Sequence, residues 1–152
     1  MSFLNALINE VGDEEVRERL QDRVDIVQHK IKFMDRVSIA FLDSENAAVK
    51  DLEQLIGEAG GVLHDNPNDA RVIIYTEPGI GMLQLMGIVP SLLVNEWPAV
   101  MYDRVYLWDD QAAVIGTPEM AVDALEDLAE MLYPGYFVFG NEGNTWMSFK
   151  TK

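Results

Sequence analysis

Cysteine is absent from this sequence of 152 residues. Disulfide bonds, thiolate nucleophiles and thiolate metal ligands are therefore excluded, and thiol–disulfide chemistry is excluded with them. A chain without disulfides fits a reducing compartment. The apolar segment from Met1 to Val11 has no basic leader and soon meets Asp13, Glu14 and Glu15, which is not typical of a signal peptide. We therefore expect a cytoplasmic location.

Basic residues are few: the sequence has 11 lysines and arginines and 26 acidic residues, so the net charge is -15. A field of this sign repels nucleic-acid phosphates and anionic membranes, so we expect neither direct nucleic-acid binding nor membrane binding. It suits a basic protein partner, a cation or plain solubility. The longest uncharged run, residues 78–95, is shorter than the roughly 20 apolar residues of a membrane-spanning helix, and Pro90 interrupts it.

Catalytic and metal-binding motifs are also missing. His29 and His64 are the only histidines, and nothing in their spacing predicts a shared metal site. Gly79 and Gly81 follow a predicted strand, but the third glycine of a dinucleotide fingerprint and the lysine of a P-loop are absent, so we predict a tight turn. No serine lies in a nucleophile-elbow motif. We therefore expect no catalytic residue, no metal and no cofactor, and the protein is not predicted to be an enzyme.

An apolar stripe runs along a helix predicted over residues 13–34, with acidic residues at its start and basic residues at its end, as the helix dipole favours. The stripe consists of Val16, Leu20, Val24, Val27 and Ile31. Its spacing allows two interpretations. The stripe covers the core of its own domain, which we favour because the heptads are few for a coiled coil, or it forms the seam of a homodimer.

Predicted strands alternate with helices along the rest of the chain. Apolar, β-branched runs predict strands, and amphipathic patterns between them predict helices. The strands are expected at 37–42, 72–75, 99–102, 105–108 and 112–115, and the helices at 46–58, 80–94 and 118–132. Two apolar runs around a glycine-rich loop predict a β-hairpin over 136–149. The alternation predicts mainly parallel strands joined by right-handed crossovers, and hence an α/β fold with a mixed sheet.

Apart from one further predicted strand before the last helix, the order of these elements over residues 36–132, βαβαββα, resembles the thioredoxin-like fold. The strand at 39–43 is similar to the first core strand of that family. The family's CxxC motif would fall at 46–49, where the residues are NAAV. The segment 97–100 is similar to the one leading into the family's cis-proline strand, which makes Pro98 the cis-proline candidate.

A second alignment with the same fold competes. Residues 72–79 are similar to the strand and loop that precede the CxxC motif of glutaredoxins, with Ile80 and Leu83 at the cysteine positions. Only 18 residues lie between Gly79 and Pro98, too few for the helix, strand and helix that glutaredoxins place there. We therefore prefer the first alignment. Neither retains a cysteine, so the family's redox activity does not carry over.

The resemblance implies a thioredoxin-like three-layer α/β/α sandwich with a mixed sheet, an N-terminal helix and a C-terminal β-hairpin. We expect a single compact domain overall. Its parts would be a helical extension at 1–35 packed on the core, a thioredoxin-like domain at 36–133 and the hairpin at 134–152.

Aromatic residues in the second half form the candidate interaction surface, because alternate side chains of a strand face outward. The surface comprises Trp97, Pro98, Tyr102, Tyr106, Trp108 and Trp146. The resemblance implies a non-catalytic, acidic protein-binding module that serves as a scaffold, chaperone or assembly factor, with a basic protein or a second copy as partner. The alternative is an acidic nucleic-acid mimic, such as a phage-type inhibitor of a DNA-binding protein. An enzyme with a pocket near Asp43 or Pro98 is a third hypothesis.

Overall fold

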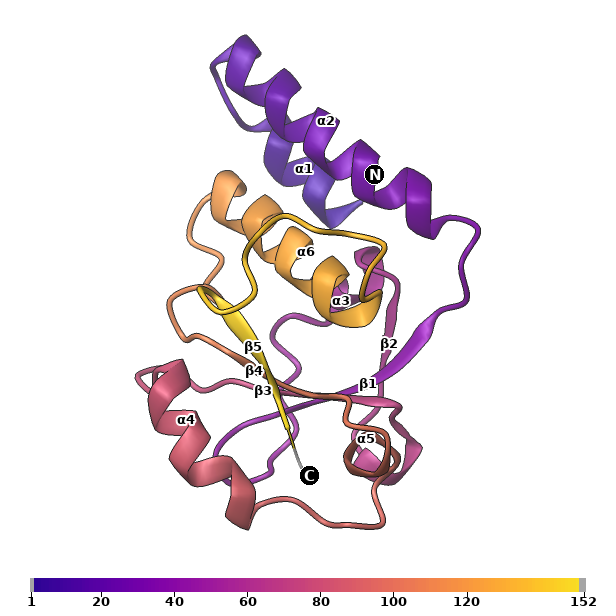
Figure 1. Ribbon diagram of the computed structural model, residues 1–152. Helices are drawn as coiled ribbons and strands as arrows, with labels where there is room; N and C mark the ends of the chain where they lie inside the picture. Colours follow the sequence, from indigo (N-terminus) through magenta and orange to yellow (C-terminus); the bar gives the residue numbers. More distant parts are fainter. Residues whose placement is uncertain (1, 151–152) are drawn as a thin grey trace.

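A five-stranded β-sheet organises the chain, whose computed structural model describes residues 2–150 (Figure 1). The strand order is β2-β1-β3-β4-β5. The first four strands are parallel, and β5 is antiparallel to β4. The strands are β1 (Val37–Leu42), β2 (Gly61–Leu63), β3 (Val72–Tyr75), β4 (Val105–Trp108) and β5 (Trp146–Phe149). The sheet is therefore mixed, and its parallel part requires crossovers through helices.

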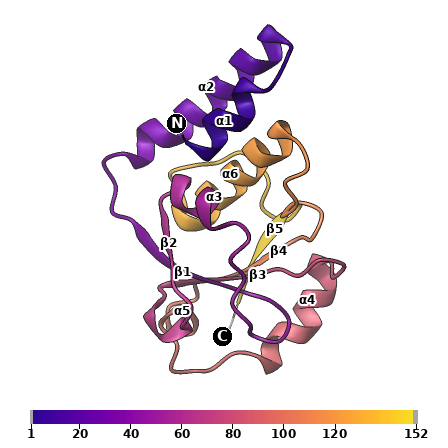
Figure 2. The same ribbon diagram turned by 180° about the vertical axis from the view of Figure 1, so that it is seen from behind.

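Helices cover both faces of this sheet, with α3 and α6 on one face and α4 and α5 on the other (Figures 1 and 2). Antiparallel helices α1 and α2 lie on the outer side of α6 and α3 and add a further layer. The helices are α1 (Phe3–Asn9), α2 (Glu14–Ile31), α3 (Glu53–Glu58), α4 (Met82–Ile88), α5 (Pro98–Met101) and α6 (Pro118–Leu132), with short 3-10 turns η1 (Pro67–Asp69) and η2 (Val89–Ser91). No helix within residues 2–150 is long and apolar enough to cross a membrane.

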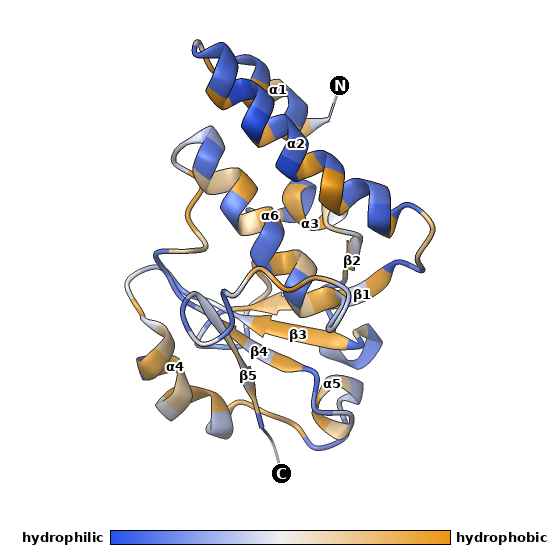
Figure 3. Ribbon diagram, turned by 45° about the horizontal axis from the view of Figure 1, so that its top comes forward, coloured by the Kyte–Doolittle hydropathy of each residue, from blue (hydrophilic) through white to orange (hydrophobic). Residues whose placement is uncertain are grey.

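Two hydrophobic cores follow from the alternation of side chains along the buried strands. In β1, Ile39 and Phe41 point into the core beneath α3 and α6. Ala40 and Leu42 point into the core beneath α4 and α5. Figure 3 shows hydrophobic strands, and above them α6 with both hydrophobic and hydrophilic residues beneath the more polar α1 and α2. Because α6 lies between the sheet and these two helices, most of it is buried, Glu126, Asp127 and Glu130 included.

Several predicted elements are confirmed, as is the coarse fold class of a mixed α/β sheet with helices. The strands at 37–42, 72–75 and 105–108 have the predicted bounds. Helix α6 begins where the sequence predicts, with the Thr117 side chain accepting a hydrogen bond from the Met120 N–H and Pro118 in the first turn. In the helix predicted over 80–94, Pro90 lies in the 3-10 turn that follows α4.

The predicted strand at 99–102 is wrong, because those residues belong mainly to the short helix α5. Pro98 occupies its first position, where a fixed φ and a missing N–H are tolerated, and the amide of Tyr102 donates to the Pro98 carbonyl. No peptide bond among residues 2–150 is cis, so Pro98 is not a cis-proline.

The predicted strands at 112–115 and 136–139 are also absent from the described chain, and with them the C-terminal hairpin. Strand β5 instead pairs with β4, which places Trp146 opposite Trp108.

The helix predicted over 46–58 begins only at Glu53. Asn46 adopts a left-handed conformation with φ of 61°, and the chain then folds back along β1. The amide of Val49 donates to the Phe41 carbonyl at 2.8 Å, so this segment satisfies its backbone through β1 and not through a helix.

The apolar stripe of α2 packs within its own chain. Leu20, Val24 and Val27 are fully buried in the core that α1, α3 and α6 share, while Val16 and Ile31 pack at its margin. This is the first of the two interpretations that the spacing allowed.

Candidate functional site

The carboxyl ends of β1 and β3 lie side by side at the point where the chain changes direction in the sheet. From β1 the chain crosses to β2 on one side, whereas β3 and β4 follow on the other. In open parallel α/β sheets, ligands bind outside the carboxyl ends of the strands at such a switch point. The loops that follow Leu42 and Tyr75 therefore form the first place to search for a site.

Ser44 and Glu77 connect these two loops directly. The Ser44 backbone N–H donates to Glu77 Oε1 at 3.1 Å, and the Ser44 hydroxyl donates to the same oxygen at 2.5 Å. The two residues are 33 positions apart in sequence, and only the neighbouring strands bring them together. Both residues are partly exposed at this edge.

Asn46 fixes the remainder of the first loop. Its side-chain oxygen accepts a hydrogen bond from the Tyr75 hydroxyl at 2.7 Å, and its amide nitrogen donates to the Leu92 carbonyl at 2.8 Å. Tyr75 is fully buried, and burial raises the pKa of its phenol above the ordinary value, so it stays a neutral donor. The loop after β1 is thus held in one conformation before any ligand binds.

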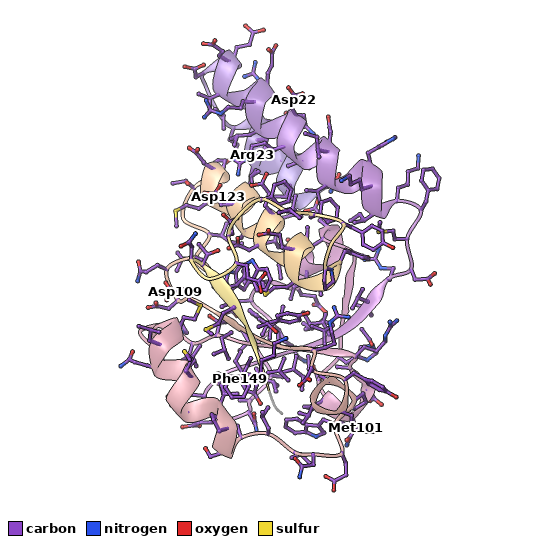
Figure 4. All side chains as sticks on the ribbon, in the orientation of Figure 1. Asp22, Arg23, Met101, Asp109, Asp123 and Phe149 are labelled. Atoms are coloured by element: carbon purple, nitrogen blue, oxygen red, sulfur yellow. The ribbon has the colours of Figure 1, made fainter. Side chains whose placement is uncertain are left out.

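The loop after β4 is tied to the same edge through Asp109. Its carboxylate accepts a hydrogen bond from the backbone N–H of Met82, in the first turn of α4, at 3.0 Å. Figure 4 shows Asp109 beside the start of α4. Three loops that are distant in sequence are therefore joined at one edge of the sheet, which makes the surface rigid.

A small cavity of about 90 Å³ opens among these loops. Its wall is mostly apolar, with two carboxylates and one hydroxyl. The lining residues are Phe41, Val49, Asp51, Leu52, Thr76, Pro78, Asp110, Ala113 and Val114. They come from β1, from the segment that folds back along it, and from the loops after β3 and β4.

The hydroxyl of Thr76 is the unusual group of this cavity. Thr76 is only 5 % exposed, and its Oγ1 has no hydrogen-bond partner among the described residues. A buried hydroxyl without a partner costs about 1–3 kcal/mol, and most buried polar atoms are paired.

A larger cleft of about 620 Å³ lies on the other side of the loop after β4, between α2, α6 and the segment that precedes β5. Arg23 of α2 reaches across to Glu126 at 2.7 and 3.1 Å and to Asp123 at 2.6 Å, and Figure 4 shows Arg23 and Asp123 between these helices. The hydrogen bond to Glu126 is the main reason that the pKa of Arg23 is raised above its ordinary value.

Asp127 forms the floor of this cleft. Its Oδ2 accepts from the Trp108 indole at 3.0 Å, and its Oδ1 accepts from Asn141 at 2.9 Å and from Thr145 at 3.0 Å. Burial raises the pKa of Asp127 to about 6, against the lowering effect of these three donors. The polar groups in the floor are thus paired with one another, so the cleft has no counterpart of the Thr76 hydroxyl.

The chemistry of this edge suits binding. No group of three histidine, cysteine, aspartate or glutamate side chains within residues 2–150 is arranged to hold a metal ion. Neither His29 nor His64 lines the cavity or the cleft, and the Ser44 hydroxyl donates to Glu77 and not to a histidine.

Most of the aromatic residues predicted to form an interaction surface lie in the interior. Trp97, Tyr106, Trp108 and Trp146 are buried, whereas Tyr102 is exposed. Pro98 is partly exposed. Strand β4 is buried on both faces, which is why Tyr106 and Trp108 do not face solvent.

Ser44, Thr76 and Glu77 were not singled out from the sequence. The available signal was their position, because Asp43-Ser44 and Thr76-Glu77 directly follow two buried strands whose carboxyl ends meet if the strands are parallel neighbours.

Comparison with known proteins gives structural similarity without sequence similarity. No protein family model matches the sequence, and no curated protein matches it. An ABC transporter substrate-binding protein from Listeria monocytogenes EGD-e is similar over 86% of this chain and 62% of its own, with a TM-score of 0.60 and 16% identity. The TroA-like periplasmic binding protein FepB from Veillonella parvula is similar over 79% and 46%, with a TM-score of 0.57 and 13% identity.

A periplasmic heme binding protein from Pseudomonas aeruginosa is similar over 80% of this chain and 51% of its own, with a TM-score of 0.50 and 16% identity. The chain therefore spans about half to three-fifths of the length of these proteins. At such identities the likeness shows a shared fold.

These similarities correct several predictions. The thioredoxin-like assignment is wrong, because the matching folds are those of substrate-binding proteins. The predicted function as a protein-binding module and the alternative of a nucleic-acid mimic are contradicted, since the similar proteins are named for binding substrates or haem. The predicted partner, a basic protein or a second copy of this chain, is contradicted for the same reason. The cytoplasmic location is contradicted as well, because two of the similar proteins are periplasmic. The absence of enzymatic activity is compatible with binding proteins as neighbours.

Proposed function

We propose that this chain is a ligand-binding module without enzymatic activity, and that it holds a small molecule at the carboxyl edge of the sheet between β1 and β3. One observation carries the proposal: a mostly apolar cavity opens at the switch point of the sheet, among the loops that follow β1, β3 and β4. The apolar wall receives the apolar part of the ligand.

The rigidity of the edge supports this function. The bonds from Ser44 to Glu77, from Tyr75 to Asn46 and from Met82 to Asp109 hold three loops before binding. A site that is formed in advance loses little conformational entropy when the ligand arrives.

The names of the similar proteins support the same class of function, because they describe substrate and haem binding. The cavity of about 90 Å³ is smaller than the roughly 300–1,000 Å³ of sites that enclose drug-sized ligands. The ligand proposed for this chain is therefore smaller than haem, or only its end group enters the cavity. We further propose a location outside the cytoplasm, which cell fractionation would test.

Fragment titration of the 15N-labelled protein, followed by NMR, tests the proposal. A set of small anionic, cationic and neutral fragments should shift the amide signals of residues 43–49, 76–81 and 109–115. The Ala113→Trp variant, which fills the cavity from its wall, should weaken binding of the fragments. Tyr102→Phe, an exposed position away from the site, is the matched control and should leave binding unchanged. Shifts confined to the cleft beside Arg23 would contradict the proposal.

A further inference from the structure

The interior of the cavity at the carboxyl edge of the sheet is hydrocarbon. The apolar residues of its lining are Phe41, Val49, Leu52, Pro78, Ala113 and Val114. Of the polar residues, Asp51 is exposed and Asp110 is half-buried, so both have contact with solvent. The Thr76 hydroxyl is enclosed by the protein and is not accessible from the cavity. A ligand therefore meets hydrocarbon inside the cavity, and its polar end stays in the solvent.

The volume of the cavity limits the size of the hydrocarbon group that enters it. This volume is about 90 Å³. An apolar cavity of roughly 150 Å³ admits benzene, which has six carbon atoms. At the same packing, the cavity of this chain takes roughly three to four carbon atoms. A propyl or butyl group fits this space, whereas an aromatic ring does not.

The wall of the cavity does not move aside easily for a larger group. The Phe41 ring is only 1% exposed and packs against the Trp108 ring, with 6.0 Å between their centroids. The Val49 amide donates to the Phe41 carbonyl at 2.8 Å, which holds the returning segment against β1. The hydrogen bond from the Met82 N–H to Asp109 fixes the start of the loop after β4. Because a closely packed wall responds to extra atoms with strain, the size of the cavity selects among ligands.

We infer that the site selects ligands that carry a short aliphatic group of about three or four carbon atoms, and that it rejects aromatic rings. The aliphatic group fills the cavity, and the rest of the ligand lies outside it. This inference rests on the proposed function, because it names the ligand class of the same cavity.

A series of alcohols measures this size limit. Ethanol, 1-propanol, 1-butanol, 1-pentanol, 1-hexanol and benzyl alcohol are each titrated into the 15N-labelled full chain, and the amide signals of residues 43–49, 76–81 and 109–115 give the dissociation constants. Each added carbon should tighten binding about fourfold up to 1-butanol, as burial of one methylene group predicts. From 1-butanol to 1-hexanol the affinity should level off, because the additional methylene groups lie outside the cavity. Benzyl alcohol should bind less tightly than 1-butanol, although its hydrocarbon part is larger.

Two variants carry the same substitution at different places. Leu52→Ala removes an isopropyl group from the wall of the cavity, which adds about as much space as three further ligand carbons take. It should therefore extend the rise in affinity to 1-hexanol and should tighten binding of benzyl alcohol about tenfold. Leu7→Ala is the matched control, because Leu7 is also partly buried but lies on α1, outside the lining. The affinity of this variant should level off at 1-butanol, as in the wild type.

The outcomes distinguish this inference from the function on which it rests. If the affinity of the wild type rises without a break to 1-hexanol, or if benzyl alcohol binds more tightly than 1-butanol, the size class is wrong while the ligand site stands. If Leu52→Ala and Leu7→Ala give the same series, the alcohols do not enter this cavity and the inference is overturned. If no alcohol shifts the signals of the three loops but the fragments of the first titration do, the inference alone falls. If neither alcohols nor fragments shift these signals, both proposals fall.

Discussion

The indole N–H of Trp108 on β4 donates to the buried carboxylate of Asp127 on α6, with 3.0 Å between Nε1 and Oδ2. One turn further along α6, Glu130 accepts in the same way from the indole of Trp146 at 3.1 Å. Trp108 and Trp146 are opposite each other on β4 and β5. The two indole–carboxylate pairs therefore fix the register between α6 and the antiparallel edge of the sheet, and they place two carboxylates in the interior.

Asp127 makes the stability of the fold depend on pH. Its pKa in the folded chain is about 6, against 3.8 for a free side chain, so the folded state favours the protonated form. The contribution of Asp127 is fully present below pH 3.8 and is lost as the pH rises through 6. This loss amounts to about 3 kcal/mol.

The Asp127→Asn variant isolates this effect from the other acidic residues, which titrate in both proteins. Asparagine resembles the protonated carboxyl group of Asp127 and does not titrate, so the stability of the variant lacks this pH dependence. Urea unfolding at pH 4, 5, 6 and 7 should show the advantage of the wild type shrinking as the pH rises. Asp22→Asn, on the exposed side of α2, should follow the wild type. An advantage that is the same at all four pH values would refute the assignment.

Arg23 connects the N-terminal helices to α6. Arg23→Met leaves Glu126, which is only 9% exposed, without its guanidinium partner. We expect a loss of about 1–3 kcal/mol in the free energy of unfolding, because a largely buried carboxylate loses its charged hydrogen bonds. Urea denaturation measures the change.

Two further variants control this prediction. Arg19→Met removes an exposed pair with Glu119 at 3.9 Å and should change stability by less than about 0.5 kcal/mol. Adding Glu126→Gln to Arg23→Met should recover part of the loss, since no charge is then left unpaired. Equal effects of Arg23→Met and Arg19→Met would show that Arg23 contributes no more than a surface pair.

Thr76→Val should stabilise the ligand-free protein. The variant removes a buried hydroxyl that has no partner, so the free energy of unfolding should rise by about 1 kcal/mol. Thr145→Val is the matched control, because its hydroxyl donates to Asp127 at 3.0 Å, and it should destabilise by a similar amount. Thermal unfolding of both variants without ligand gives the comparison, and a loss of stability in Thr76→Val would indicate an unrecognised partner.

The core strands could be read from the sequence because they are buried on both faces. Runs such as 37–42 and 72–75 are apolar without interruption. A helix of that length would bury one face and would need apolar residues only on that face. The start of α6 was equally clear, since Thr117 and Pro118 supply a cap and a first turn. Short elements were not predictable in this way. Helix α5 has four residues of strand-like composition, and its helical form depends on Pro98 and on its packing against the sheet.

The strand order of the sheet and the position of the site depend on contacts between segments that are distant in sequence. Such contacts cannot be read from the sequence alone. One alternation of strands and helices is compatible with several strand orders, which is why the thioredoxin-like assignment failed. Ser44 and Glu77 meet only because β1 and β3 are neighbours. The unpaired state of the Thr76 hydroxyl is likewise a property of the folded chain, because any nearby acceptor or donor would remove it.

Gly60 provides a separate test of how tightly α3, β2 and α6 are joined. Its φ is +95°, and a Cβ atom there would lie less than 3.0 Å from the Tyr133 hydroxyl oxygen. That hydroxyl donates to the carbonyls of Asp35 at 3.0 Å and Gly60 at 3.3 Å. Gly60→Ala must therefore strain the backbone and also displace Tyr133 from both bonds. We expect a loss of about 3 kcal/mol in the free energy of unfolding.

Gly79→Ala separates the two causes. Gly79 has a similar φ of +84°, but no atom lies within 4 Å of its virtual Cβ. Its loss should be about 1 kcal/mol, from backbone strain alone. Urea denaturation of both variants therefore measures the contribution of the Tyr133 contact as the difference between them. If the two variants lose equal stability, Tyr133 moves aside without cost, and its two hydrogen bonds do not hold the end of α6 against β2.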